Sequence, residues 1–392
     1  MSNNDDDIPC LKDGTSFHAV EGGGVVFSAR QGRLYALSPV ASLSWLCMKD
    51  GLSVPECALA ISKAFGIEHS IAAEWFCSST TLFKDFGLLD TANGNGEHIQ
   101  QRRFEPVLAG VPSGESCWGS RSRYQLFEQN FCISAPAELQ PLIDSLLKNL
   151  RIDFRQQELK PALTIDIVRR DGMWDISLAG RQETSCKTES VAPEIERLIV
   201  QAIVPATPHL LAFHAASLQC RDRTFLLAGR SGIGKTTLSL ALQRAGWDFG
   251  SDEIALLSRD LRLLPVPLPA CVKADRFSSI ETLFSELRTA PEHNRYGKRI
   301  KYLAMRSTVF DAEEGIVVFP HYDASGPNKI ETLEGFVGLQ KLLEQCVFVP
   351  SGFRHEDVKL LLQWHTLQKY VSVQYNNCDS AVVFLTNIIE SN

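Results

Sequence analysis

The chain has 392 residues, which is enough for two or three compact domains of about 100 to 200 residues each. Its 44% hydrophobic and 22% charged residues are typical of a globular protein, and no apolar run approaches the roughly 20 residues that a membrane-spanning helix needs. The start, MSNNDDDIPC, lacks the basic end and apolar segment of a secretory signal, so we expect a cytoplasmic protein without a membrane partner.

Charge and cysteine usage argue against two further classes. Residues 1–100 hold 6 Lys and Arg against 12 Asp and Glu, a charge of −6 out of the chain's −7. Because such a region repels phosphate backbones, we expect no nucleic-acid partner. The 11 cysteines include no CxxC pair and most have apolar neighbours, which favours buried free thiols over a disulfide framework or a metal site.

The first part of the chain, to about residue 90, predicts a β-hairpin followed by three helices. Ser38 followed by Pro39 supplies an N-cap and a first-turn proline, and Ser53 with Glu56 has the spacing of a capping box. The predicted segments are strands 25–29 and 33–37, joined by Arg30-Gln31-Gly32, and helices that start at Ser38, at Ser53 and near residue 72.

The second part, about residues 102–207, predicts an α+β region. It follows the polar, Gly- and Asn-rich stretch 91–103, which is typical of a linker. The strand-like pieces are 124–133, 163–168 and 174–178, and the helix-like pieces are 137–150 and 193–204. This part contains no recognisable chemical motif, and the chain shows no internal repeat.

The third part carries the clearest motif, a glycine-rich loop between a strand and a helix. Residues 224–228 form a short apolar strand, GRSGIGKT fits G-x-x-x-x-G-K-[ST], and residues 237–245 form a helix that Gly246 ends. Backbone N–H groups of such a loop face phosphates, the lysine reaches the β- and γ-phosphates, and the threonine hydroxyl ligates Mg²⁺. We therefore expect ATP and Mg²⁺, contacted by Gly229, Arg230, Ser231, Gly232, Ile233, Gly234, Lys235, Thr236 and Thr237.

The loop alone does not indicate how the nucleotide is used, but two flanking features distinguish between classes of nucleotide-binding protein. The chain lacks the NKxD of GTPases and the LSGGQ of transporter ATPases. His214 stands in an apolar segment 21 residues before Lys235, and Asp252-Glu253 follow a strand-like segment 17 residues after it. Carboxylates at the carboxyl end of a strand can divide metal binding and proton acceptance between them. Taken alone, His214 would be interpreted as a core histidine and Asp252 as a loop residue.

His214, the loop GRSGIGKT and the later Ser251-Asp252-Glu253 resemble the catalytic domain of HPr kinase/phosphorylase and its relatives, over about residues 210–257. That family phosphorylates a serine hydroxyl on a protein. The resemblance implies that Asp252 accepts the serine proton and that His214 orients it or stabilises charge. It also implies that Glu253 stands near the metal, where the family has a second aspartate.

Two further comparisons with this family concern its other motifs. In the nearest relatives a Pro-rich strand ends in a lysine, and PVPLPACVK resembles it, which implies that Lys273 contacts phosphate or the acceptor. The family's second signature contains a glutamate and an arginine and is linked to reverse phosphorolysis. We do not find it here, so we do not expect the reverse reaction.

The first part resembles PqqD, the peptide-binding protein of pyrroloquinoline quinone biosynthesis, and the precursor-recognition domains built like it. The resemblance rests on LYALSPVASLSWLCMKDGLSVPE and on the closing Phe86-Gly87-Leu88-Leu89. Winged-helix DNA readers share this architecture, but the acidic charge disfavours DNA. The resemblance implies that a leader peptide adds to the hairpin edge near 33–37 and packs on Trp75, Ser78 and Leu82, although Trp75 and Leu82 could equally be core.

Together these features predict an α/β chain in which an HPr-kinase-like catalytic domain, 209–392, follows a PqqD-like domain, 1–95, and a middle α+β region, 96–208. The predicted function is phosphorylation of a serine or threonine of a precursor peptide that is held through its leader. The alternatives are a regulatory kinase of a folded HPr-like carrier and a nucleotide-gated peptide chaperone without phosphotransfer. The kinase relatives assemble as hexamers, and whether this chain also forms a homo-oligomer stays open.

Overall fold

The computed structural model describes residues 10–90, 120–152 and 163–390. The chain divides into two compact units: residues 1–101 with 333–344 and 349–367, and residues 102–332 with 345–348 and 368–392. The acidic start, the linker predicted at 91–103 and the predicted boundary at 95/96 lie outside the described residues. The domain boundaries therefore stay predictions.

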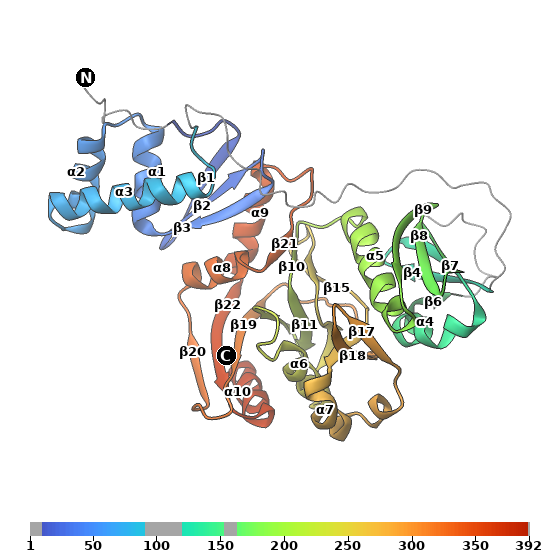
Figure 1. Cartoon of the computed structure of the whole chain (residues 1–392). Helices are drawn as coiled ribbons and strands as arrows, with labels where there is room; N and C mark the ends of the chain where they lie inside the picture. The colour runs from blue at the N-terminus through green and yellow to red at the C-terminus, as the bar shows by residue number, and fades with distance from the viewer. Residues whose placement is uncertain (1–9, 91–119, 153–162, 391–392) are drawn as a thin grey trace. The chain divides into compact units, whose positions relative to one another are not determined.

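The first unit contains a three-stranded antiparallel sheet and five helices (Figure 1). Its elements are β1 (Thr15–Val20), β2 (Gly23–Ser28), β3 (Arg33–Leu37), α1 (Pro39–Lys49), α2 (Val54–Phe65), α3 (His69–Asp85), α8 (Gly335–Leu343) and α9 (His355–Thr366). The predicted hairpin is β2–β3, and the three predicted helices follow it. We did not predict β1, which pairs with β2, because its sequence TSFHAV has too few apolar residues to alternate clearly.

The predicted caps explain where the first two helices begin. The Ser38 hydroxyl accepts a hydrogen bond of 3.3 Å from the Ala41 N–H, and the Glu56 carboxylate accepts one of 2.8 Å from the Ser53 N–H. Both bonds satisfy backbone donors that the first turn of a helix leaves unpaired. At the far end of α2, Gly66 takes a φ of 65°, a conformation that glycine adopts at little cost.

Helices from far along the chain, α8 and α9, complete the sheet of the first unit. The ring of Phe353, just before α9, lies 4.9 Å from that of Phe27, and the ring of Phe336 on α8 covers Gly23 so closely that a Cβ there would stand 2.6 Å from it. Helices α1–α3 cover the other face through Val26. Strand β2 is therefore buried on both faces, and residues that we had assigned to the third part of the chain belong to this packing.

In the second unit, the predicted middle region forms a six-stranded sheet covered by helices. Its elements are β4 (Ser120–Leu126), β5 (Gln129–Ala135), α4 (Gln140–Leu147), β6 (Arg151–Ile152), β7 (Leu163–Arg170), β8 (Met173–Leu178), β9 (Arg181–Cys186) and α5 (Val191–Ala206), with strand order β6-β4-β5-β7-β8-β9. The single strand predicted at 124–133 is wrong: it is a hairpin that turns at Phe127, whose φ is 55°.

The rest of the second unit surrounds a six-stranded sheet with order β13-β11-β12-β19-β22-β20. Its elements are β10 (Leu211–Phe213), β11 (Ala215–Cys220), β12 (Arg223–Ala228), α6 (Lys235–Arg244), β13 (Asp248–Ser251), β14 (Ala255–Leu257), β15 (Leu263–Pro265), β16 (Ala270–Lys273), α7 (Phe277–Leu283), β17 (Glu292–Arg295), β18 (Lys298–Leu303), β19 (Gly315–Tyr322), β20 (Lys329–Thr332), β21 (Cys346–Phe348), β22 (Gln368–Tyr375) and α10 (Cys378–Glu390). Two smaller sheets, β15-β14-β10-β21 and β16-β18-β17, complete it.

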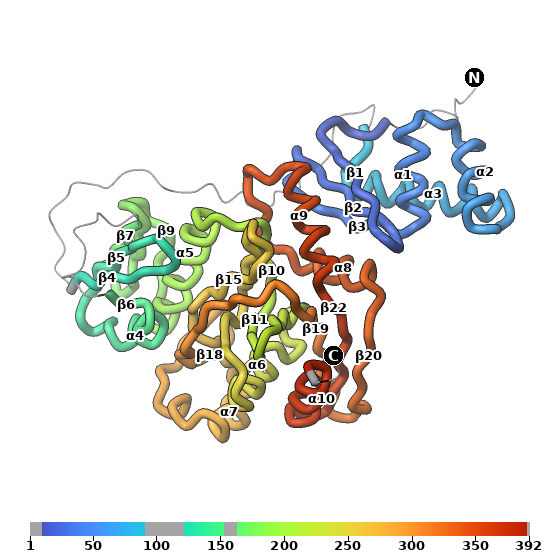
Figure 2. Tube along the Cα trace, turned by 180° about the vertical axis from the view of Figure 1, so that it is seen from behind, coloured from blue at the N-terminus to red at the C-terminus, as the bar shows by residue number. Residues whose placement is uncertain are grey.

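The parallel strands of this sheet determine where a site can form. Strands β12, β19 and β22 are parallel, so their carboxyl ends meet at one edge. Helices α6 and α10 share a hydrophobic core with them, and α10 lies beside β22 (Figure 2). Open α/β sheets bind ligands at the carboxyl edge of parallel strands, which is the edge that the glycine-rich loop leaves from.

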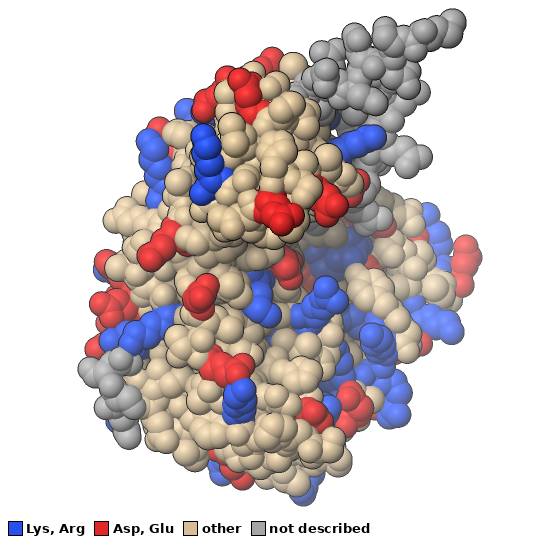
Figure 3. Space-filling model, turned by 90° about the vertical axis from the view of Figure 1, so that its left-hand side faces the viewer, with Lys and Arg blue, Asp and Glu red and all other residues tan. Residues whose placement is uncertain are grey.

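The described residues also bear on surface and cysteine predictions. No described helix is long and apolar enough to cross a membrane. The face drawn in Figure 3 carries both acidic and basic side chains. Cys47, Cys57 and Cys271 are buried free thiols as predicted, whereas Cys10 and Cys77 are exposed.

The packing of Phe353 against Phe27 within the first unit leads to a stability prediction. Replacing the buried Phe353 by alanine should lower the free energy of unfolding of the first unit by about 3 kcal/mol, because it leaves a cavity against Phe27. Hydrogen exchange of the β2 amides measures this loss. The control Val383→Ala, at a side chain on α10 that is 54% exposed, should change stability by less than about 0.5 kcal/mol. Unchanged β2 protection in Phe353→Ala would contradict the packing argument.

Candidate functional site

The loop Gly229–Thr236, which we call the glycine loop, connects β12 to α6 as the motif requires. The helix begins at Lys235, two residues earlier than predicted. Gly234 has a φ of 102°, and a Cβ there would stand 2.6 Å from the hydroxyl of Tyr375. Only glycine fits this position, so the loop can turn tightly into the N-terminus of α6.

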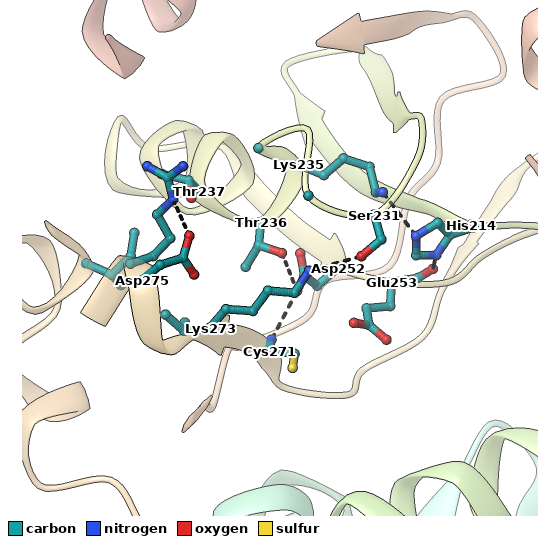
Figure 4. Close-up of a pocket in the computed structure, with 15 residues that line it drawn as sticks. His214, Ser231, Lys235, Thr236, Thr237, Asp252, Glu253, Cys271, Lys273 and Asp275 are labelled. Carbon is teal, nitrogen blue, oxygen red and sulfur yellow. Dashed lines mark hydrogen bonds and ion pairs between the residues drawn. The ribbon is translucent and has the colours of Figure 1, made fainter. Parts of the chain in front are cut away.

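A pocket lies over this loop and brings most of the predicted residues together (Figure 4). Its lining includes the predicted residues His214, Ser231, Gly232, Gly234, Lys235, Thr236, Thr237, Asp252, Glu253 and Lys273, together with Cys271, Val272, Asp275, Arg276 and Ile280. Gly229, Arg230 and Ile233 belong to the same loop but lie outside this lining. The strands that carry these residues are distant in sequence, so the convergence comes from the fold.

Lys235 uses all three of its N–H donors within the site. Its ammonium donates to the carbonyl oxygens of Gly229 at 2.6 Å and Arg230 at 3.2 Å, and to Nε2 of His214 at 3.1 Å. The side chain is buried, and burial lowers the lysine pKa to about 8 although Asp252 and Glu253 act to raise it. A phosphate at this loop would take over the contacts that the two carbonyls now provide.

The contacts of His214 define its tautomer. The residue stands between β10 and β11, where its Nδ1 lies 3.0 Å from the carbonyl oxygen of Glu253 and its Nε2 faces the Lys235 ammonium. A carbonyl only accepts and an ammonium only donates, so Nδ1 carries the proton and Nε2 accepts. Burial, followed by Lys235, lowers the histidine pKa. His214 therefore orients Lys235, and its expected role of orienting Asp252 or stabilising charge stays a prediction.

Asp252 is the carboxylate that lies closest to the glycine loop. Its Oδ2 accepts hydrogen bonds from the Thr236 hydroxyl at 3.1 Å and from the Cys271 N–H at 3.0 Å. Its Oδ1 is buried and has no hydrogen-bond partner among the described residues. Burial and the neighbouring Glu253 raise the pKa of this carboxyl to about 7. A buried oxygen without a donor is suited to accept a proton or to bind a cation.

Glu253 has a partner that the sequence did not suggest. Both of its carboxylate oxygens accept hydrogen bonds from Arg295 on β17, at 3.0 and 2.9 Å. The metal role that we assigned to Glu253 stays a prediction, and in this structure the carboxylate is held in a bidentate ion pair.

Arg295 also links the site to the middle region. It lies 3.5 Å from the carboxylate of Glu196 on α5, which accepts a 2.7 Å hydrogen bond from Tyr302. Burial, with Glu253 next, raises the pKa of Glu196 to about 7. We did not predict Glu196, Arg295 or Tyr302, because they lie on three elements whose approach depends on tertiary packing.

Lys273, the last residue of β16, reaches toward the glycine loop (Figure 4). Its ammonium donates to the Ser231 hydroxyl at 3.0 Å, and this contact is exposed to solvent. Lys273 lines the pocket, and its contact with phosphate or acceptor stays a prediction.

The site fits a magnesium ion that is held mainly by a ligand. Among the described residues, no group of three or more His, Cys, Asp or Glu side chains is arranged to hold a metal ion. The Thr236 hydroxyl and the Asp252 carboxylate are oxygen ligands, which Mg²⁺ prefers, and Mg²⁺ bound to a nucleotide takes its other ligands from phosphates and water.

Comparisons with known proteins find partial matches among solved structures only. No family model matches the chain, and no curated protein matches it. Among solved structures, TbiB1 in complex with the TbiA(beta) leader peptide matches at 16% sequence identity and a TM-score of 0.20, covering 22% of this chain and 99% of that chain. A TM-score this low carries no argument about function.

The buried carboxyl of Asp252 leads to a pH prediction. Its pKa is raised from 3.8 to about 7, so the folded state holds the proton more tightly than the unfolded state. The resulting stabilisation is fully present below about pH 4 and is lost as the pH rises through about 7. Asp252→Asn does not titrate, so its free energy of unfolding should rise relative to that of the wild type between pH 4 and 7, on the order of a few kcal/mol.

Urea unfolding at several pH values measures this difference. The matched control is Asp248→Asn, at an exposed aspartate on β13. A stability difference between Asp252→Asn and wild type that does not vary with pH would show that the Asp252 carboxyl has an ordinary pKa.

Proposed function

We propose that the chain is an ATP-dependent kinase that phosphorylates a serine or threonine hydroxyl of a ribosomally made precursor peptide, whose leader the first unit binds. The observation that carries the kinase proposal is the buried carboxylate of Asp252 in the same pocket as Lys235 and Thr236. This arrangement combines a cation for phosphate, a hydroxyl for Mg²⁺ and a proton acceptor.

The proposed chemistry assigns one role to each of these side chains. Asp252 accepts the proton as the acceptor oxygen attacks the γ-phosphorus, and the bond from that phosphorus to the bridging oxygen breaks to release ADP. A carboxyl pKa of about 7 suits a general base near neutral pH. Lys235, kept in place by His214, stabilises the phosphate charge, and the Thr236 hydroxyl holds Mg²⁺.

Access to Asp252 requires a local opening. The Oδ1 atom is buried, so the acceptor hydroxyl reaches it only when neighbouring side chains move. The Lys273–Ser231 hydrogen bond of the lining is exposed, so water competes for both partners and weakens it. We propose that Lys273 leaves Ser231 for the bound phosphates and so opens the pocket to the acceptor.

Leader binding is proposed on the first unit from its own surface. Three apolar side chains remain exposed along one side of α3: Ile71 (40%), Trp75 (38%) and Leu82 (36%). Trp75 and Leu82 are therefore not core; the buried side of α3 carries Phe76 and Phe83. Beyond this exposed strip, the partly buried Phe86 stacks its ring on that of Tyr35 of β3, with the centroids 4.6 Å apart.

The strip ends beside an open strand edge. Strand β3 pairs only with β2 among the described residues, so no further strand occupies its other edge there. An extended peptide can add there as a further strand and place apolar side chains along α3. Tethering the leader raises the effective concentration of the acceptor, commonly to about the millimolar range, so the catalytic pocket can bind it weakly.

Phosphotransfer is tested with ATP, Mg²⁺ and a precursor peptide encoded beside the gene. Mass spectrometry should show one added phosphate. Asp252→Asn should lower kcat by about 100-fold or more while ATP affinity changes little, and Asp248→Asn should behave like the wild type. Full activity of the Asp252→Asn variant would exclude the Asp252 carboxylate as the general base. ATP-dependent leader binding without any transfer would instead support a nucleotide-gated chaperone, and transfer only to a folded carrier would support a regulatory kinase.

Leader recognition is tested by point substitutions. Deleting only residues 1–101 is a poor test, because it would uncover Phe336 and Phe353, which belong to the same unit. Trp75→Ala should raise KM for the full precursor about 10-fold and leave KM for a leaderless core peptide unchanged. Leu59→Ala, at an equally exposed apolar side chain on α2, is the control. An equal rise in KM for both peptides would contradict leader binding along α3.

A further inference from the structure

The pocket over the glycine loop has an end that the proposed chemistry does not use. Thr237 and Asp275 lie on the opposite side of the pocket from His214 and Glu253 (Figure 4). The loop lysine reaches the β- and γ-phosphates, and the γ-phosphate is transferred beside Asp252. The nucleoside of the donor therefore points toward Thr237 and Asp275.

Arg276 presents a planar group at this end. Its Nε lies 3.3 Å from the carboxylate of Asp275, and its guanidinium carbon lies over the ring of Tyr322, 5.2 Å from the centroid. The Arg276 side chain nevertheless keeps 39% of its area exposed. One face of the guanidinium is thus supported by an aromatic ring while part of the group remains open to a ligand.

The support under Arg276 is connected to the glycine loop. Tyr322 ends β19 and is in register with Tyr375, which ends the parallel strand β22; the two rings lie 5.6 Å apart. The Tyr375 hydroxyl donates to the carbonyl oxygen of Gly234 at 3.4 Å. Arg276 and the phosphate-facing backbone are therefore held at one edge of one sheet, where a ligand spanning both is expected.

We propose that the guanidinium of Arg276, backed by Tyr322, is the surface on which the nucleobase of the phosphate donor stacks. This inference rests on the proposed nucleotide site and adds the part of that site that recognises the nucleoside. A guanidinium plane stacks on bases and a lysine ammonium does not. The ligand class is a nucleoside triphosphate, and inorganic triphosphate gains nothing from Arg276 stacking.

The test compares ATP with inorganic tripolyphosphate, both with Mg²⁺, by calorimetry on the full chain. Arg276→Lys keeps the charge and loses the plane, so it should weaken ATP binding about 5- to 50-fold and leave tripolyphosphate binding within about twofold. Tyr322→Leu should also weaken ATP binding and leave tripolyphosphate binding unchanged, but the loss of ATP affinity should be smaller. Lys329→Ala on β20 is the control and should bind both ligands like the wild type.

Three results would overturn the proposal, and they are distinguishable. Equal weakening of both ligands in Arg276→Lys would make Arg276 a phosphate contact. Unchanged ATP affinity in a variant with wild-type circular dichroism and melting temperature would remove Arg276 from the site. A wild-type protein that binds neither ligand would reject the nucleotide site itself, and with it both the kinase and the stacking proposals.

Discussion

The candidate site depends on two opposite charges that are buried in the lining of one pocket. Burial lowers the pKa of Lys235 to about 8 and raises that of Asp252 to about 7, although each charge acts to stabilise the other. Desolvation thus outweighs their mutual attraction. The cost is borne by the surrounding fold, and it leaves a strong cation and a proton acceptor that are poorly solvated. Both properties would favour the proposed phosphotransfer, because neither group has a full hydration shell to lose.

The elements around this pair show why the middle region belongs to the site. Glu196 comes from α5, and it meets Arg295, which in turn holds both oxygens of Glu253. The guanidinium between two carboxylates offsets part of their repulsion at the pocket floor. A region without any recognisable motif therefore contributes a buried charge that fixes the residue next to Asp252. Its fold therefore supports the site through electrostatics.

Local signals in the sequence predicted local structure well. The caps at Ser38 and Ser53, the hairpin β2–β3 and the order of strand, glycine loop and helix all follow from short patterns of neighbouring residues. The contacts that depend on distant elements were not predictable in this way. Nothing near Glu253 indicates Arg295, and nothing near β2 indicates Phe353, because each pair is joined only by tertiary packing. The turn at Phe127 was missed for a different reason, since a bulky residue at positive φ gives no turn signal.

One segment connects the two proposed activities through the chain itself. Helix α8 packs on β3 of the first unit, and the chain then runs through Glu344 directly into Gln345. The carbonyl oxygen of Gln345 accepts a 2.8 Å hydrogen bond from the backbone N–H of His214, and the following strand, β21, pairs with β10. The backbone that positions His214, and through it Lys235, is thus continuous with a helix that completes the first unit. Removing residues 1–101 would take away the strands on which α8 packs, so the segment that leads to Gln345 would lose its anchor.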